Sequence, residues 1–152
     1  EKLNLLVLIA SDLKLIHAHN VIHCDLHSGN ILQNDLYSAY IGDLGLSITV
    51  NNVLKAKDGI YGVIPYIAPE VLNNRTYSAA SDVYSFAIIA YEVVSGKLAF
   101  SDIPHDIRLM HKILHGLRPA IPSHVPKLIA KLIMKCWDTR PNNRPTSEEI
   151  YD

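Results

Sequence analysis

Apolar residues near the start of the chain recur at intervals of three and four positions, as they do on one face of an α-helix. The residues that set this pattern are Leu6, Ile9, Leu13 and Ile16. We expect the helix to extend from about residue 2 to residue 18. Asn20 follows, and asparagine tolerates the left-handed backbone conformation that often ends a helix. The pattern therefore predicts that the chain begins with one long helix.

Short segments with the character of β-strands follow this helix, and turn-forming residues separate them. The strand-like segments are Val21-Ile22, residues 31–33 and Tyr40-Ile41, with turn-formers at Gly29-Asn30, Asn34-Asp35 and Gly42-Asp43. Between residues 51 and 64 the hydrophobic pattern loses its period. We expect a long surface loop there, and long loops in compact domains are often functional.

The part of the chain after Pro69 is predicted to be helical. Residues 83–94 are almost wholly apolar, and Ser81-Asp82 can cap the start of a helix that ends before Gly96. Such a helix must be buried on all sides, and it is too short to span a bilayer. Further helices are predicted near residues 106–115, near residues 125–137 and after Pro145-Thr146. The predicted fold class is mainly α with a few short β-strands.

Composition narrows the class of protein. Of the 152 residues, 49% are hydrophobic and 19% are charged, which is typical of one folded globular domain. The formal net charge of −1, without a basic block, argues against nucleic-acid binding. Cys24 and Cys136 form no CxxC pair and no disulfide framework, so we expect a reduced, cytoplasmic setting. The sequence shows no signal peptide, and we expect no membrane insertion.

The candidate chemistry lies in a polar loop and in two short motifs that follow it. Asp25 and Asn30 stand five residues apart in this loop, Asp43 precedes Leu44-Gly45, and Ala68-Pro69-Glu70 comes later. Phosphoryl transfer needs a carboxylate that orients the attacking hydroxyl and oxygen ligands that hold Mg²⁺. Asp25 suits the first role, and Asn30 and Asp43 suit the second. Each residue alone could be an ordinary cap or a solvated charge, but their order and spacing together favour this chemistry.

These motifs resemble the signature of protein kinases. From about residue 3 to residue 152, the chain resembles the C-terminal lobe of a eukaryotic-type protein kinase. The matching segments are HCDLHSGNIL at the catalytic loop, DLG at the metal-binding motif, YGVIPYIAPEVL at the end of the activation segment, SDVYSFAIIAYEVVSG at the central helix and CWDTRPNNRPT at the closing arginine motif. The style of the loop and of the ending resembles the tyrosine-kinase-like group, which leans toward Ser/Thr substrates. The loop together with the activation segment resembles kinases of arbuscular-mycorrhizal fungi.

The resemblance implies ATP and Mg²⁺ as cofactors and a protein substrate whose Ser or Thr hydroxyl accepts the γ-phosphate. Glu70 would pair with Arg144, and Asp82 would accept hydrogen bonds from the backbone of the catalytic loop. His23 and Leu44 would stack in an apolar column. Leu32 would lie beneath the adenine of ATP and form part of the cofactor site, with Ile89 and Val93 below it.

Four positions depart from the family pattern, and one of them, Ala87 in place of a common Gly, is expected to be benign. Cys24 replaces the Arg that normally meets a phosphate on the activation loop, which removes one reason for activation by phosphorylation. His27 occupies the catalytic position where Ser/Thr kinases often carry a Lys, and an imidazole neutralises phosphate well only when protonated. Val63 stands in place of a Thr and cannot hydrogen-bond near Asp25. These changes leave open the alternative of a pseudokinase or degenerate lobe that serves as a binding scaffold.

The printed sequence contains no Gly-rich phosphate loop and no strand-borne Lys, which belong to the N-terminal lobe of a kinase. We therefore expect residues 1–152 to be the C-terminal lobe only, truncated at both ends. ATP binds between the two lobes of a kinase. Without the missing N-terminal lobe, this chain alone is expected to have little or no activity.

The sequence disfavours three other kinds of site: a histidine metal site, a reactive cysteine and a phosphorylation site. The spacings of His17 with His19 and of His23 with His27 invite a metal-ligand hypothesis, but zinc needs ligands that converge from a fixed frame. Cys24 is expected to be inert, since the neighbouring Asp25 raises the pKa of a thiol. Residues of the presumed activation segment that phosphorylation could target are Ser47, Thr49 and Tyr61, for which ordinary surface positions are the simpler hypothesis.

Overall fold

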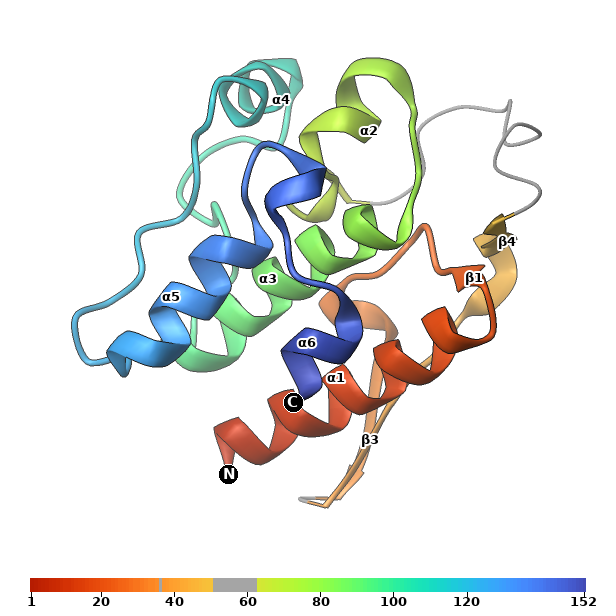
Figure 1. The fold of residues 1–152 in the computed structure, drawn as a ribbon. Coiled ribbons are helices and arrows are strands. Elements are labelled where there is room, and N and C mark those ends of the chain that lie inside the picture. Colours follow the sequence, from red (N-terminus) through yellow and green to blue (C-terminus); the bar gives the residue numbers. More distant parts are fainter. Residues whose placement is uncertain (36, 51–62) are drawn as a thin grey trace.

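The computed structural model describes residues 1–35, 37–50 and 63–152, and helices dominate this part of the chain (Figure 1). The helices are α1 (Lys2–Ala18), α2 (Pro69–Asn74), α3 (Ala79–Ser95), α4 (Ile107–Leu114), α5 (Lys127–Cys136) and α6 (Ser147–Tyr151). The strands are β1 (Val21–Ile22), β2 (Ile31–Asp35), β3 (Ser38–Ile41) and β4 (Ile48–Thr49). The predicted class, mainly α with a few short strands, is confirmed. Tyr61 and most of the loop predicted between residues 51 and 64 lie outside the described residues.

Helix α3 forms the centre of the fold, and Figure 1 shows it between α1 and α5, which both pack against it. Most of its side chains are buried, as its apolar sequence predicts. Its start was predicted wrongly, because the N-cap is Ser78 and not Ser81-Asp82. Ser78 and Ser81 bond each other's backbone N–H groups in a capping box, which places Asp82 inside the first turn. The helix ends at Gly96, whose φ of 74° is accessible to glycine without strain.

Helix α1 has the bounds that its apolar spacing predicts. Leu6, Ile9 and Leu13 are buried, and the helix packs against α3, α6 and β3. It ends at Ala18, and Asn20 adopts a left-handed φ of 57°, as expected for the residue that stops it. This stop turns the chain directly into β1.

Two antiparallel strand pairs hold the polar loop that follows β1. Val21 of β1 pairs with Thr49 of β4, and Ile31 of β2 pairs with Ile41 of β3. The β4 strand was not predicted from the sequence. Since β2 and β3 are neighbours, their pairing brings the loop at residues 23–30 beside residues 42–47. The fold thus places the two predicted catalytic segments side by side.

The C-terminal half completes the core from the other side of α3. The predicted helices near residues 106–115 and 125–137 are α4 and α5, and the one predicted after Pro145-Thr146 is α6. Helix α5 packs on α3, and α6 packs on α1. None of the helices in the described ranges is both long and apolar enough to traverse a membrane.

Candidate active site

The loop between β1 and β2 is fixed by the carboxylate of a buried aspartate on α3. Asp82 is only 2% exposed. Its Oδ2 accepts the backbone N–H of His23 at 2.8 Å, and its Oδ1 accepts the N–H of Cys24 at 3.1 Å. These bonds hold Cys24 at a φ of 69°, a conformation that non-glycine residues adopt rarely. The predicted role of Asp82 as the anchor of the loop backbone is confirmed.

His17, which the sequence analysis did not assign to the site, supports the same carboxylate from α1. Its Nε2 lies 2.9 Å from Asp82 Oδ2, and its Nδ1 lies 2.9 Å from Ser147 Oγ at the start of α6. One imidazole therefore connects three helices to the anchor of the loop. The sequence did contain a signal, because His17 follows buried Leu13 by four residues and so lies on the buried face of α1.

His23 connects the two halves of the site. Its Nδ1 accepts the N–H of Asp25 at 3.2 Å, and its Nε2 donates to the carbonyl of Gly42 at 2.8 Å. Both ring nitrogens are thus occupied, which fixes the neutral tautomer with the proton on Nε2. Because Gly42 precedes Asp43, this ring fixes the backbone of Asp43 relative to that of Asp25.

Asp25 presents a carboxylate that none of the described residues hydrogen-bonds. His27 lies beside it, with its Nε2 3.8 Å from Asp25 Oδ1, too far for a hydrogen bond. The Nδ1 of His27 accepts the N–H of Gly29 at 3.1 Å, so the neutral ring carries its proton on Nε2, toward Asp25. A Cβ on Gly29 would lie 2.9 Å from this ring, which explains the glycine. The arrangement offers a free carboxylate base beside an N–H donor.

Asn30 and Asp43 supply two further side chains with oxygen atoms at this site. The Nδ2 of Asn30 donates to the carbonyl of Asp25 at 2.7 Å, and no described residue bonds its Oδ1. The carbonyl of Asn30 accepts the N–H of Gly42 at 2.8 Å, which brings Asp43 close. Asp43 has a left-handed φ of 54°, and its Oδ1 accepts the N–H of Gly45 at 3.3 Å. Amide and carboxylate oxygens are the donors that Mg²⁺ prefers, so this pair fits a magnesium ion.

The residues predicted to lie beneath the adenine and in the apolar column differ in burial. Leu32 is 56% exposed and Leu44 is 49% exposed, whereas Ile89 on α3 is buried. Leu32 also covers Gly42, where a Cβ would lie 3.0 Å from its Cδ1. The buried ring of His23 is committed to hydrogen bonds. Stacking of His23 with Leu44, and nucleotide contact by Leu32, therefore stay predictions.

Cys24 is buried, and burial is the main reason that the pKa of its thiol is raised to about 12. The carboxylate of Asp82 raises the pKa further, and that of Asp25 contributes less. The predicted direction of this pKa is confirmed, and an inert thiol stays a prediction. The main cause is burial, whereas Asp25, the neighbour that the sequence suggested, contributes least among the groups that raise the pKa.

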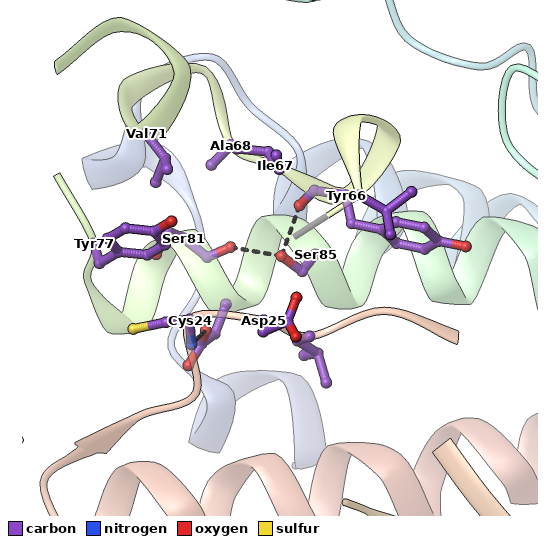
Figure 2. Close-up of a pocket in the computed structure, with 12 residues that line it drawn as sticks. Cys24, Asp25, Tyr66, Ile67, Ala68, Val71, Tyr77, Ser81 and Ser85 are labelled. Carbon is purple, nitrogen blue, oxygen red and sulfur yellow. Dashed lines mark hydrogen bonds between the residues drawn. The ribbon is translucent and has the colours of Figure 1, made fainter. Parts of the chain in front are cut away.

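The segment before α2 closes over Asp25 and lines a small cavity that the sequence did not reveal. Figure 2 shows Cys24 and Asp25 on one side of this cavity, with Tyr66 and Ser85 on the other. Ser85 Oγ donates to the carbonyl of Tyr66 at 2.7 Å. The hydroxyl of Tyr66 donates to Glu92 at 2.8 Å, and burial together with Glu92 raises the pKa of Tyr66. These contacts fix the segment that would face a substrate.

Arg144 ties the same segment to the end of the chain. Its Nη1 and Nη2 bond the two oxygens of Glu70 at 2.7 and 2.8 Å, which forms a bidentate pair. Two further donors bond the carbonyls of Ala80 and Asp138, each at 2.8 Å. The predicted pairing of Glu70 with Arg144 is confirmed. Tyr84 lies under this guanidinium, 5.2 Å from ring centroid to Cζ.

Comparison with known proteins agrees with this geometry. The family described as "Protein tyrosine and serine/threonine kinase" matches residues 1–152. A probable serine/threonine-protein kinase of Dictyostelium discoideum is 34% identical over 93% of this chain, and the RGS domain-containing serine/threonine-protein kinase A of that organism is 34% identical over 99%. A serine/threonine-protein kinase of Arabidopsis thaliana is 31% identical over 95% of this chain.

The chain spans only 10%, 13% and 25% of the length of these three relatives. The match of the family extends over the whole chain and includes both the catalytic-loop segment and the Glu70–Arg144 pair. On the strength of these matches, the chain belongs to the protein tyrosine and serine/threonine kinase family.

Proposed function

We propose that this chain is the C-terminal lobe of a protein kinase that transfers the γ-phosphate of ATP to Ser or Thr hydroxyls of proteins. The observation that carries the proposal is the state of Asp25. Its carboxylate is free of hydrogen bonds to the described residues, while the loop around it is fixed by Asp82. A free, fixed carboxylate can accept a hydrogen bond from a substrate hydroxyl and take its proton during transfer.

The oxygens of Asn30 and Asp43 would hold Mg²⁺, since the amide group of Asn30 is turned so that its oxygen is available. A bound Mg²⁺ neutralises charge on the phosphates of the nucleotide. The N–H of His27 Nε2, next to Asp25, is placed to donate to the transferring phosphoryl group in the role that Lys has in many relatives. Leu32 would contact the adenine, and an N-terminal lobe would cover the nucleotide from the other side.

The naming of the relatives as serine/threonine kinases supports Ser or Thr as the accepting residue. Membership in the tyrosine-kinase-like group rests on the catalytic loop and on the CWDTRPNNRPT ending, and is part of the proposal. So is a cytoplasmic location, which the two unpaired cysteines suggest.

A pseudokinase that acts as a scaffold is the second candidate. Two substitutions in the described site favour it: His27 replaces a permanently charged Lys, and Val63 replaces a Thr that would hydrogen-bond near Asp25. In this case the ordered loop would serve as architecture, and the chain would bind a protein partner without transferring phosphate.

The test is phosphotransfer from labelled Mg·ATP to a generic protein substrate, with the chain as printed and with the chain extended by its native upstream residues. Activity of the extended form should fall about 100-fold or more in Asp25→Asn, the range typical for loss of a general base. The matched control is Asp102→Asn, which removes an exposed carboxylate distant in sequence from the loop and should leave activity unchanged.

Equal activity of Asp25→Asn and the parent would refute the role of Asp25. If both forms of the chain fold, as circular dichroism would show, yet neither transfers phosphate, the scaffold proposal replaces the enzyme.

A further inference from the structure

Two histidines lie one helical turn apart on α4, away from the catalytic loop. His111 and His115 are both exposed, and their spacing of four residues places them on the same face of the helix. Their ring centroids are 4.2 Å apart, with an angle of 33° between the ring planes. The two imidazoles are therefore already neighbours, without any rearrangement of the backbone.

The ring of His115 is oriented by the helix itself. Its Nδ1 donates to the carbonyl of His111 at 2.8 Å, which leaves the lone pair of its Nε2 directed to solvent. A backbone carbonyl that binds one ring N–H is the usual arrangement of a histidine whose other nitrogen binds a metal. The ring of His111 bonds to none of the described residues, so it is free to turn toward the same point.

We infer that His111 and His115 form a binding site for one divalent transition-metal ion of the kind that prefers imidazole, such as Zn²⁺, Ni²⁺ or Cu²⁺. Two histidines at this spacing on a helix converge on one metal in known zinc motifs. The site also lies on the last turn of α4, where the carbonyl ends of the helix favour a cation. Arg108 and Lys112, each three residues before one of the histidines, oppose binding and limit its strength.

The pair would not complete the coordination of the ion. Within the ranges that the structure describes, no three His, Cys, Asp or Glu residues gather to hold a metal. Water would therefore fill the remaining positions, as at an open site. Such an ion joins two successive turns of α4 and should stabilise the folded chain in proportion to its affinity.

The fold contains its own control for this inference. His19 ends α1 as His115 ends α4: its Nδ1 lies 2.8 Å from the carbonyl of Leu15, four residues earlier, with nearly the same backbone conformation. The residue at that earlier position is leucine, which is 57% exposed, and not histidine. His19 and His115 therefore share the same capping geometry, and α1 lacks only the second histidine.

The test is calorimetric titration of the untagged chain with Ni²⁺ at pH 7.5. We expect saturable binding of one ion to the helix site, weakened by about tenfold or more in His111→Asn and in His115→Asn, since even loss of an outer partner of a ligand has an effect of this size. The control His19→Asn should bind as the parent does. Leu15→His should add a second site of similar affinity on α1.

Two outcomes would overturn the inference. One is Ni²⁺ binding that is unaffected by both His111→Asn and His115→Asn. The other is absence of Ni²⁺ binding in the parent, whether or not Leu15→His binds. Since α4 lies outside the catalytic loop, neither outcome depends on whether the chain transfers phosphate. Unfolding of each variant by urea would show that any loss of binding is not a loss of fold.

Discussion

Removal of the imidazole of His17 should destabilise the fold more than its position at the end of α1 suggests. The change His17→Ala deletes the partner of Asp82 Oδ2 and the partner of Ser147 Oγ, both at 2.9 Å. Asp82 is 2% exposed, so its carboxylate cannot recover the lost bond from bulk water. The backbone N–H groups of His23 and Cys24 would then be its only remaining partners among the described residues.

The expected loss of unfolding free energy follows from the two hydrogen bonds of His17. A hydrogen bond to a charged group contributes about 1.5–3 kcal/mol, and one between neutral groups about 0.5–1.5 kcal/mol. A hollow of about 400 Å³ beside His17 and Ser147 would let water replace part of the second bond. We therefore expect His17→Ala to lower the free energy of unfolding by about 2–4 kcal/mol, a large part of the roughly 5–15 kcal/mol of a typical domain.

The assay is urea unfolding of the chain, followed by circular dichroism. The matched control is His19→Ala, two residues away, which deletes an exposed imidazole whose described bond is to the carbonyl of Leu15. It should cost less than about 1 kcal/mol. If His17→Ala costs no more than His19→Ala, the argument that His17 supports the buried Asp82 is refuted.

Two further predictions concern Arg144 and the cysteines. Arg144→Lys keeps the charge but loses the bidentate pair with Glu70. It should lower the free energy of unfolding, measured in urea, by about 1.5–3 kcal/mol. The control Arg140→Lys, on the exposed surface, should have no measurable effect. Burial raises the pKa of both Cys24 and Cys136 from 9.0 to about 12, so the neutral thiols stabilise the folded state below pH 9, and this contribution is lost as the pH rises from 9 toward 12. The free energy of unfolding should therefore drop between pH 8 and pH 10.5, by at most about 1.4 kcal/mol per pH unit for each thiol, and a variant with both cysteines changed to Ala should drop less. An equal drop in the parent and in the variant without cysteines would contradict the role of these two thiols.

Local patterns predicted the elements whose residues contact near neighbours in sequence. The apolar period of α1 and the stop at Asn20 are local, and the structure has both. The start of α3 was misplaced because two serines can both serve as caps. Ser78 is the true cap and Ser81 its partner three residues later, so the pattern alone could not separate them. The local pattern alone made Asp82 look like part of the cap, whereas its carboxylate is bound to the loop 59 residues earlier, as the family resemblance implied.

Contacts between distant segments could be predicted only where the family resemblance supplied them. The pairing of Glu70 with Arg144 was predicted in this way, although 74 residues separate them. The role of His17 was not predicted, because its partners Asp82 and Ser147 lie 65 and 130 residues away. Strand β4 was missed for a similar physical reason. Two residues carry no period, and β4 exists only because it pairs with Val21-Ile22.

The contacts around Cys24 bear on how such a site could be regulated. In the family pattern that the sequence resembles, an Arg at this position meets an anion, a phosphate on the activation loop. Here a buried neutral thiol takes that place, and the N–H of Cys24 is held by Asp82, which His17 supports from α1. The bonds described for this loop therefore come from other elements of the chain, α1 and α3. We expect the geometry of Asp25 to be independent of phosphorylation, so treatment of the extended chain with phosphatase should leave its phosphotransfer rate unchanged.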